Sequence, residues 1–289
     1  MDIFHAPDFV LPPVRRGVSM VTVYDLAFLV YPECAHPNLR VFLERAVPAS
    51  VQRADYIVAD SENTRNDVIC LLDARPERVF VVPGGVDPVF VPATQEEVAE
   101  ARRRYRLDRP YVLTVGVIEP RKNLPRLIDA YARFRVRTGL PHQLVIAGGR
   151  GWLSEQTFRQ AEGCGFPGDV RFTGYVPDPD LAALYTGAEV FAYPSLYEGF
   201  GLPVLEAMAC GTAVVCSNSS SLPEFATDAA LMVSPTDPDA IADALETACC
   251  DTRLREELTE KGRKRASIYS WNRSAQKLLE IYERVGRAR

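Results

Sequence analysis

Short apolar runs alternate with amphipathic stretches along almost the whole chain, and this alternation limits the possible folds more than any other feature. Each apolar run is typical of a buried strand, and each amphipathic stretch is typical of a helix. A repeated strand–helix order predicts parallel sheets with helices on both faces. The sequence therefore predicts an α/β fold built from Rossmann-like, doubly wound domains.

Residues 1–91 contain few strand–helix units for a doubly wound domain and are predicted to form a partial first domain. The predicted elements are strands at Asp2–His5, Met20–Tyr24, Tyr56–Ala59 and Val79–Val82, and helices at Asn38–Arg53 and Ser61–Leu72. The hydroxyl of Ser61 is expected to cap the second helix. The Gly- and Pro-rich segment Pro83–Pro92 interrupts both periodicities and predicts a domain boundary.

Residues 92–270 repeat the pattern in full after a predicted linker helix at Glu96–Tyr105. Strands are predicted at Tyr111–Gly116, Gln143–Ala147, Val170–Thr173, Val190–Tyr193, Ala213–Cys216 and Ala230–Val233. Helices are predicted at Leu124–Thr138, Leu153–Gly163, Asp178–Thr186, Leu202–Ala209, Leu222–Phe225, Asp237–Cys249 and Arg253–Ile268. This series is long enough for a complete doubly wound domain. A last helix is predicted at Asn272–Arg287, within residues 271–289.

The composition excludes several classes of protein. A net charge of −5 and a pI of about 5.4 argue against a general nucleic-acid binder. The 7 cysteines form no C-x-x-C pair and are interpreted as reduced, mostly buried thiols, and the 3 histidines are too scattered for a zinc site. No signal peptide and no apolar run of ~18 residues is visible, so a cytoplasmic location is expected.

Two cations follow the strand predicted at Tyr111–Gly116. Arg121 and Lys122 lie in a loop that opens the next helix, where both the helix N-terminus and the side chains favour phosphate. A solvated basic helix start explains the pair equally well. Gly148 follows the next strand and permits close approach to a ligand, although an ordinary strand-to-helix turn is the favoured interpretation.

Two carboxylates follow the strand Val190–Tyr193. Glu198 lies in a loop with Gly199 and Gly201, and Glu206 lies two turns later on the next helix. Backbone N–H groups at such a helix N-terminus face an anionic ligand, and the carboxylates accept hydrogen bonds from hydroxyl groups. This is the arrangement that a sugar and a ribose need, while a solvated helix face is the alternative.

Four segments together resemble the signature of family-4 glycosyltransferases. They are Tyr193–Gly211 (YPSLYEGFGLPVLEAMACG), Gly116–Leu124 (GVIEPRKNL), Val82–Asp87 (VPGGVD) and Asp60–Thr64 (DSENT). They occur in the order of the family, and the resemblance covers almost the whole chain. It implies the two-domain glycosyltransferase-B fold, with the donor bound mainly by the second domain.

The resemblance also implies the roles of individual residues. It implies that Glu206 binds the ribose, that Glu198 contacts the transferred sugar, and that Arg121 and Lys122 stabilise the departing diphosphate without a metal ion. The other donor-binding positions that it implies are Gly116, Gly148, Gly199, Phe200, Gly201 and Leu202. Such enzymes transfer with retention of anomeric configuration, so no carboxylate nucleophile is expected.

In the first domain, which is expected to supply the acceptor side, the resemblance implies a catalytic position for His5 and donor-binding positions for Tyr24 and Asp25. The family typically has histidine where this chain has Tyr24, whose phenol can also donate a hydrogen bond. A histidine that is satisfied at a strand end is the alternative for His5.

Relatives usually carry further strand–helix units before the position of residue 1, so the first domain is expected to be truncated relative to them. A fragment, a late start or a partner that covers the unpaired sheet edge are the explanations left open. The last helix is expected to cross back to the first domain, with Trp271 as its anchor. The basic run Lys261–Arg265 suggests either contact with an anionic membrane surface or, preferably, a solvated helix end.

The function predicted from the sequence is a retaining hexosyltransferase of the mannose or glucose type. It would use a GDP- or UDP-linked sugar and a glycan or lipid-linked acceptor, with neither a cofactor nor a metal. The alternative is a nucleotide-sugar-binding remnant without turnover, which would bind the donor but not transfer its sugar.

Overall fold

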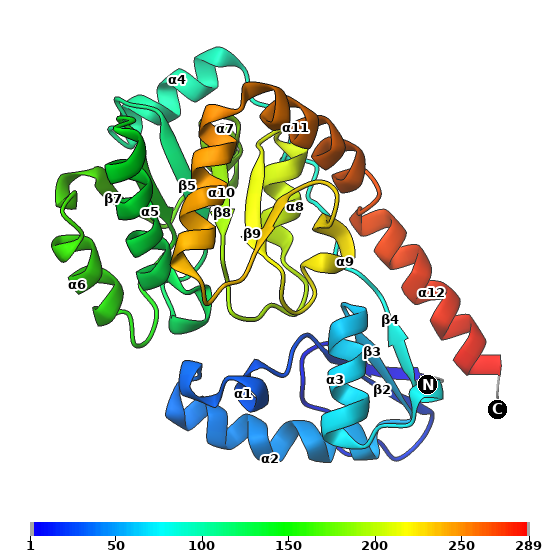
Figure 1. The fold of residues 1–289 in the computed structure, drawn as a ribbon. Helices are drawn as coiled ribbons and strands as arrows, with labels where there is room; N and C mark the ends of the chain where they lie inside the picture. The colour runs from blue at the N-terminus through cyan, green and yellow to red at the C-terminus, as the bar shows by residue number, and fades with distance from the viewer. Residues whose placement is uncertain (1–2, 288–289) are drawn as a thin grey trace. The chain divides into compact units, whose positions relative to one another are not determined.

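The chain folds into two compact units in the computed structural model, which describes residues 3–287 (Figure 1). Asp2, where the first strand was predicted to begin, and residues 288–289 lie outside the described residues. Unit 1 comprises residues 3–85, 197–200 and 269–287, and unit 2 comprises residues 86–196 and 201–268. The first division between the units, at Gly85 and Val86, lies inside the Gly- and Pro-rich segment.

Unit 1 contains a 4-stranded parallel sheet with the strand order β1-β2-β3-β4. The strands are β1 (Ile3–Ala6), β2 (Val18–Val23), β3 (Tyr56–Ala59) and β4 (Val79–Val81). Alternate residues point to opposite faces, so Val21 and Ile57 pack on one side while Met20 and Val58 pack on the other. The predicted parallel sheet of the first domain is thereby confirmed.

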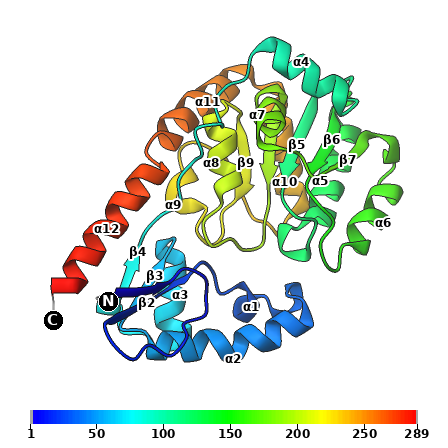
Figure 2. The same ribbon diagram turned by 180° about the vertical axis from the view of Figure 1, so that it is seen from behind.

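Each face of this sheet is covered by helices. Helices α2 (Pro37–Arg53) and α3 (Glu62–Leu72) cover one face, and α12 (Trp271–Arg287) covers the other (Figures 1 and 2). Ser61 caps α3 as predicted, because its hydroxyl accepts from the Thr64 N–H at 3.0 Å. Two short elements after β2 were not predicted from the sequence, namely α1 (Ala27–Val30) and η1 (Pro32–Cys34).

Helix α12 is held on the sheet of unit 1 by an apolar stripe. Ile281 and Val285, one turn apart, are buried against Val18 and Met20, and the Ser274 hydroxyl donates to a backbone carbonyl oxygen at 2.6 Å. The prediction that Trp271 anchors the helix is wrong, because this side chain is 50% exposed.

Unit 2 contains a 6-stranded parallel sheet with the order β10-β9-β8-β5-β6-β7. The strands are β5 (Tyr111–Val115), β6 (Gln143–Ala147), β7 (Val170–Gly174), β8 (Val190–Tyr193), β9 (Val214–Ser217) and β10 (Leu231–Val233). The strand order reverses between β5 and β8, which makes this pair the topological switch point. Ligands of open α/β sheets bind beyond the carboxyl ends of the strands at such a point.

Helices cover both faces of the sheet in unit 2 (Figures 1 and 2). Helices α5 (Leu124–Thr138), α6 (Glu155–Gly163) and α10 (Pro238–Cys250) pack together on one face. The other face carries α4 (Gln95–Arg104), α7 (Asp178–Gly187), α8 (Leu202–Ala209) and α11 (Thr252–Ala266), and α9 (Pro223–Ala226) contacts α11. The remaining short elements are η2 (Pro76–Arg78), η3 (Pro120–Lys122) and η4 (Pro167–Asp169). The predicted doubly wound domain is confirmed.

The structure also bears on the cysteines, on membrane-spanning helices and on the basic run Lys261–Arg265. Within residues 3–287 no cysteine forms a disulfide bond, and most are buried or partly buried, although Cys70 and Cys250 are exposed. Within residues 3–287, no helix is both long and apolar enough to cross a bilayer. In the basic run, Lys264 pairs with Glu260 at 2.5 Å and Arg265 pairs with an aspartate at 2.6 Å, so two of its charges already have partners.

Candidate donor-binding site

The loops at the switch point of unit 2 are joined by a buried asparagine. The Asn123 side chain donates to the carbonyl oxygens of Pro194 at 2.9 Å and Pro235 at 2.7 Å. It thereby connects the loops that follow β5, β8 and β10. The Leu196 N–H also donates to the Arg121 carbonyl oxygen at 2.9 Å, so the backbone around the predicted phosphate-binding pair is fixed. This role of Asn123 was not predicted from the sequence.

Lys122 lies at this switch point with its side chain held along its length. Its Nζ donates to the Tyr193 hydroxyl at 2.6 Å and lies 4.9 Å from the centroid of the same ring. Its Cε lies 3.1 Å from the position that a Cβ on Gly116 would occupy. A flexible lysine is thus ordered before any ligand binds, which reduces the entropy lost on binding.

Arg121 is oriented by a neighbouring carboxylate. Its guanidinium lies 2.9 Å from Glu119 Oε1, and Glu119 is only 4% exposed. Arg121 therefore pairs with a buried carboxylate next to Lys122 in the loop after β5. The sequence-predicted residues Gly116, Arg121 and Lys122 are brought together at the carboxyl end of this strand.

Gly148 follows β6 and contacts the loop after β5. A Cβ on Gly148 would lie 2.0 Å from the Gly116 carbonyl oxygen, and its φ of +148° is one that other residues rarely adopt. The close approach is between two segments of the protein backbone. Gly148 therefore sets the position of the Gly116 loop.

Helix α8 begins at the carboxyl end of β8 and carries Glu206. Gly201 is its N-cap, with Leu202 and Pro203 in the first turn. Glu206 accepts a hydrogen bond from the Tyr185 hydroxyl at 3.0 Å. Loss of solvent around it, with the nearby carboxylates of unit 2, raises the pKa of Glu206 to about 7. In the part of the chain that the structure describes, no cation pairs with this carboxylate.

Replacing Glu206 by glutamine is expected to stabilise the unliganded protein at pH 8. The glutamate pKa rises from 4.5 to about 7 on folding, so the folded state favours the protonated form. Its contribution to stability is therefore present below about pH 4.5 and is lost as the pH rises through 7. Removing the buried charge should add about 2–3 kcal/mol to the free energy of unfolding at pH 8 and little at pH 5.

Urea denaturation at both pH values tests this expectation, with Glu256→Gln on the exposed surface of α11 as the control. Equal changes at pH 5 and pH 8 would contradict the buried-charge explanation.

Residues 197–200 group with unit 1, where Gly199 contacts the segment after β2. A Cβ on Gly199 would lie 2.1 Å from the Tyr24 carbonyl oxygen, which also accepts from the Thr64 hydroxyl at 3.1 Å. Tyr24 and Gly199, predicted separately, are therefore neighbours. In the same segment Glu198 is 5% exposed, and the Phe200 ring packs edge-on against Tyr269.

Tyr24 and Asp25, the two candidate residues that follow β2, each make a hydrogen bond within unit 1. The Tyr24 side chain is 41% exposed, and its hydroxyl donates to the Pro7 carbonyl oxygen at 2.8 Å. Partial burial and the carboxylates of Asp8 and Asp60 raise the pKa of the Tyr24 phenol. The Asp25 carboxylate accepts from the N–H of Ala27, the first residue of α1, at 2.9 Å.

His5 makes a hydrogen bond through each of its ring nitrogens. Nδ1 lies 2.5 Å from the Tyr282 hydroxyl on α12, and Nε2 lies 2.8 Å from the Thr22 hydroxyl. Burial lowers the pKa of His5. A proton transfer through His5 would require one of these bonds to open, so the geometry favours the alternative of a satisfied histidine.

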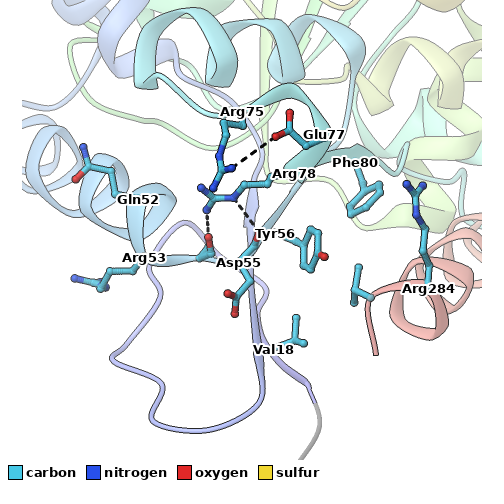
Figure 3. A pocket seen from close by; sticks show the side chains of 12 residues that line it. Val18, Gln52, Arg53, Asp55, Tyr56, Arg75, Glu77, Arg78, Phe80 and Arg284 are labelled. Carbon is cyan, nitrogen blue, oxygen red and sulfur yellow. Dashed lines mark hydrogen bonds and ion pairs between the residues drawn. The ribbon is translucent and has the colours of Figure 1, made fainter. Parts of the chain in front are cut away.

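A hollow of about 690 Å³ in unit 1 lies at the amino-terminal ends of the strands, where Val18 begins β2 and Tyr56 begins β3 (Figure 3). Arg78 in this hollow donates to the carbonyl oxygens of Ala54 and Asp55 at the end of α2. Ligands of parallel sheets bind at the opposite end. We therefore assign no site to the hollow. Across residues 3–287, no group of three or more His, Cys, Asp or Glu side chains could hold a metal ion.

Solved structures define the class of protein to which this arrangement belongs. Sucrose-phosphate synthase from Thermosynechococcus elongatus has a TM-score of 0.79 at 26% identity, over 95% of this chain and 69% of that chain. Anabaena Alr3699/HepE in complex with UDP and glucose has a TM-score of 0.79 at 20% identity, over 92% of this chain and 72% of that chain. The fold is that of the GT-B glycosyltransferases.

Sequence comparison identifies the family. Residues 96–265 match the family model described as glycosyl transferases group 1. O-antigen chain mannosyltransferase B of Escherichia coli is 36% identical over 283 residues, which make up 97% of this chain and 74% of that protein. This chain belongs to the glycosyl transferases group 1 family. It spans only 30–31% of the length of several longer relatives.

Proposed function

We propose that the chain transfers a mannose-type hexose from a nucleotide-sugar donor to a glycan or lipid-linked acceptor, with retention and without a metal ion. The name of the E. coli relative, an O-antigen chain mannosyltransferase, supports the sugar and the acceptor class. The UDP and glucose bound to the Anabaena structure support a nucleotide-sugar donor. The observation that carries the proposal is the ordered Lys122 at the switch point of the same unit that holds Glu206.

In this proposal, different residues of unit 2 bind different parts of the nucleotide-sugar donor. Lys122 and Arg121 stabilise the charge that develops on the departing diphosphate, where preorganised cations act most strongly. Glu206 accepts hydrogen bonds from the ribose, and backbone N–H groups at the start of α8, near Gly201, face the diphosphate. Retention follows if the leaving phosphate takes the proton of the acceptor hydroxyl on the same face of the sugar. No carboxylate nucleophile is then needed.

The roles of the remaining candidate residues stay predictions. Glu198 and Gly199 are proposed to contact the transferred sugar, and Tyr24 and Asp25 are proposed to help bind the donor. His5 is proposed to hold β1 in position through its two hydrogen bonds rather than to transfer a proton. A cytoplasmic location, peripheral membrane contact and a partner at the β1 edge also stay predictions.

Thermal-shift and calorimetric measurements on the full chain test the donor site. The probes are GDP, UDP, ADP and their sugars, each with and without EDTA. One nucleotide at about one hundred times its Kd should stabilise the folded state by about 2.7 kcal/mol, and EDTA should not change this. The Glu206→Ala variant should lose most of the shift. A folded protein that responds to none of the probes contradicts the proposal, whereas binding without transfer favours the remnant alternative.

A further inference from the structure

The hydroxyl of Tyr185 is fixed by packing on several sides. The residue lies on α7 and has no solvent exposure, and its ring packs edge-on against Phe191 at 5.3 Å and against Phe90 at 6.0 Å between centroids. Its backbone carbonyl oxygen accepts from the Thr212 hydroxyl at 2.6 Å. The phenol therefore cannot turn away from Glu206, which it reaches at 3.0 Å.

The groups around Glu206 show how this hydrogen bond affects the protonation state of its carboxylate. Tyr185 faces it from α7, and the carboxylates of Asp178 and Asp87 in the same unit repel its negative charge. The thiol of Cys210, at the C-cap of α8, offers no compensating charge, because burial raises its pKa. The hydrogen bond from Tyr185 is the interaction that favours the ionised form, against desolvation and the two carboxylates.

The hydrogen-bond acceptors that remain on Glu206 suit a ribose. Tyr185 donates to Glu206 Oε2, which leaves the other oxygen and the remaining lone pairs as acceptors. A ribose presents two neighbouring hydroxyl donors, and an ionised carboxylate can accept from both. A protonated or rotated carboxyl group would lose one of these bonds.

We propose that Tyr185 is a positioning residue, which holds the Glu206 carboxylate ionised and aimed at the ribose hydroxyls of the nucleotide donor. This inference rests on the proposed function, because it assigns the ribose to Glu206. It adds a residue that makes no contact with the donor.

The test is the pH dependence of nucleotide binding in the Tyr185→Phe variant, which keeps the ring and removes only the hydroxyl. In the wild type, affinity for the nucleotide selected in the screen should fall as the pH drops through about 7, because Glu206 is protonated there. In the variant the midpoint should move up by about one pH unit. Affinity at pH 7 should fall about 5- to 10-fold and recover near pH 9.

Tyr131→Phe is a matched control within the same unit. Tyr131 is also fully buried, and its hydroxyl donates to the His142 carbonyl oxygen at 2.7 Å. This variant should lose stability without changing the midpoint. Incorporation of 3-fluorotyrosine at position 185 provides a second test that does not depend on the fold tolerating Phe. The more acidic phenol is a stronger donor and should move the midpoint down.

The outcomes separate the two proposals. A wild type that binds no nucleotide between pH 6 and 9 contradicts the proposed function and this inference with it. A wild type that binds, with an unchanged midpoint in both variants at position 185, contradicts only the positioning role. A uniform loss of affinity at every pH would also contradict it, because that pattern indicates a structural effect.

Discussion

Replacing Lys122 by alanine is expected to lower kcat about 100- to 1,000-fold while the affinity for the donor changes much less. The negative charge on the leaving diphosphate grows during bond cleavage, so a fixed cation stabilises the transition state more than the ground state. Lys122 is ordered for this task by Tyr193 and by the space beside Gly116. The Tyr193→Phe variant keeps the ring and loses only the hydroxyl, so a smaller loss of about 3- to 10-fold is expected.

Initial rates of donor turnover, with nucleotide affinity measured in parallel by calorimetry, check this prediction. Lys264→Ala is the control, because Lys264 is exposed on α11 and pairs with the neighbouring Glu260 at 2.5 Å. It should retain wild-type rates. If Lys122→Ala lowers binding and kcat by the same factor, then Lys122 contributes ground-state binding alone and the proposed role is wrong.

The fold was predictable from the sequence because its signals are local. Strands such as Gln143–Ala147 and Val190–Tyr193 are short apolar runs, and the bounds of these two were predicted without error. The short helix Ala27–Val30 was missed because a helix of one turn shows no periodicity. Trp271 was chosen for its size, whereas the pair Ile281 and Val285, at helical spacing, is what packs on the sheet.

The candidate site was predictable only in part, because its supporting contacts are distant in sequence. Tyr185 and Glu206 are separated by 21 positions, and Lys122 and Tyr193 by 71. In the sequence both tyrosines look like ordinary apolar residues of a core helix or strand. Only the folded sheet, with β5 beside β8, shows that their hydroxyls face the charged residues of the site.

Replacing Gly148 by alanine is expected to lower the free energy of unfolding by about 3 kcal/mol or more and to reduce nucleotide binding. The new Cβ would lie 2.0 Å from the Gly116 carbonyl oxygen at a φ of +148°, so the backbone must move. Gly116 borders the Lys122 side chain. A shift of this loop therefore displaces the cation as well as weakening the fold.

The neighbouring Gly149 offers a control that isolates this contact. A Cβ on Gly149 meets nothing within 4 Å, so Gly149→Ala should change the stability by less than about 0.5 kcal/mol. Urea denaturation and calorimetry on both variants give the comparison. If the two alanine variants behave alike, then the β6 loop tolerates movement and the Gly116–Gly148 contact does not position Lys122. If only Gly148→Ala loses both stability and binding, then a contact between two backbone segments fixes the cation that the proposed reaction needs.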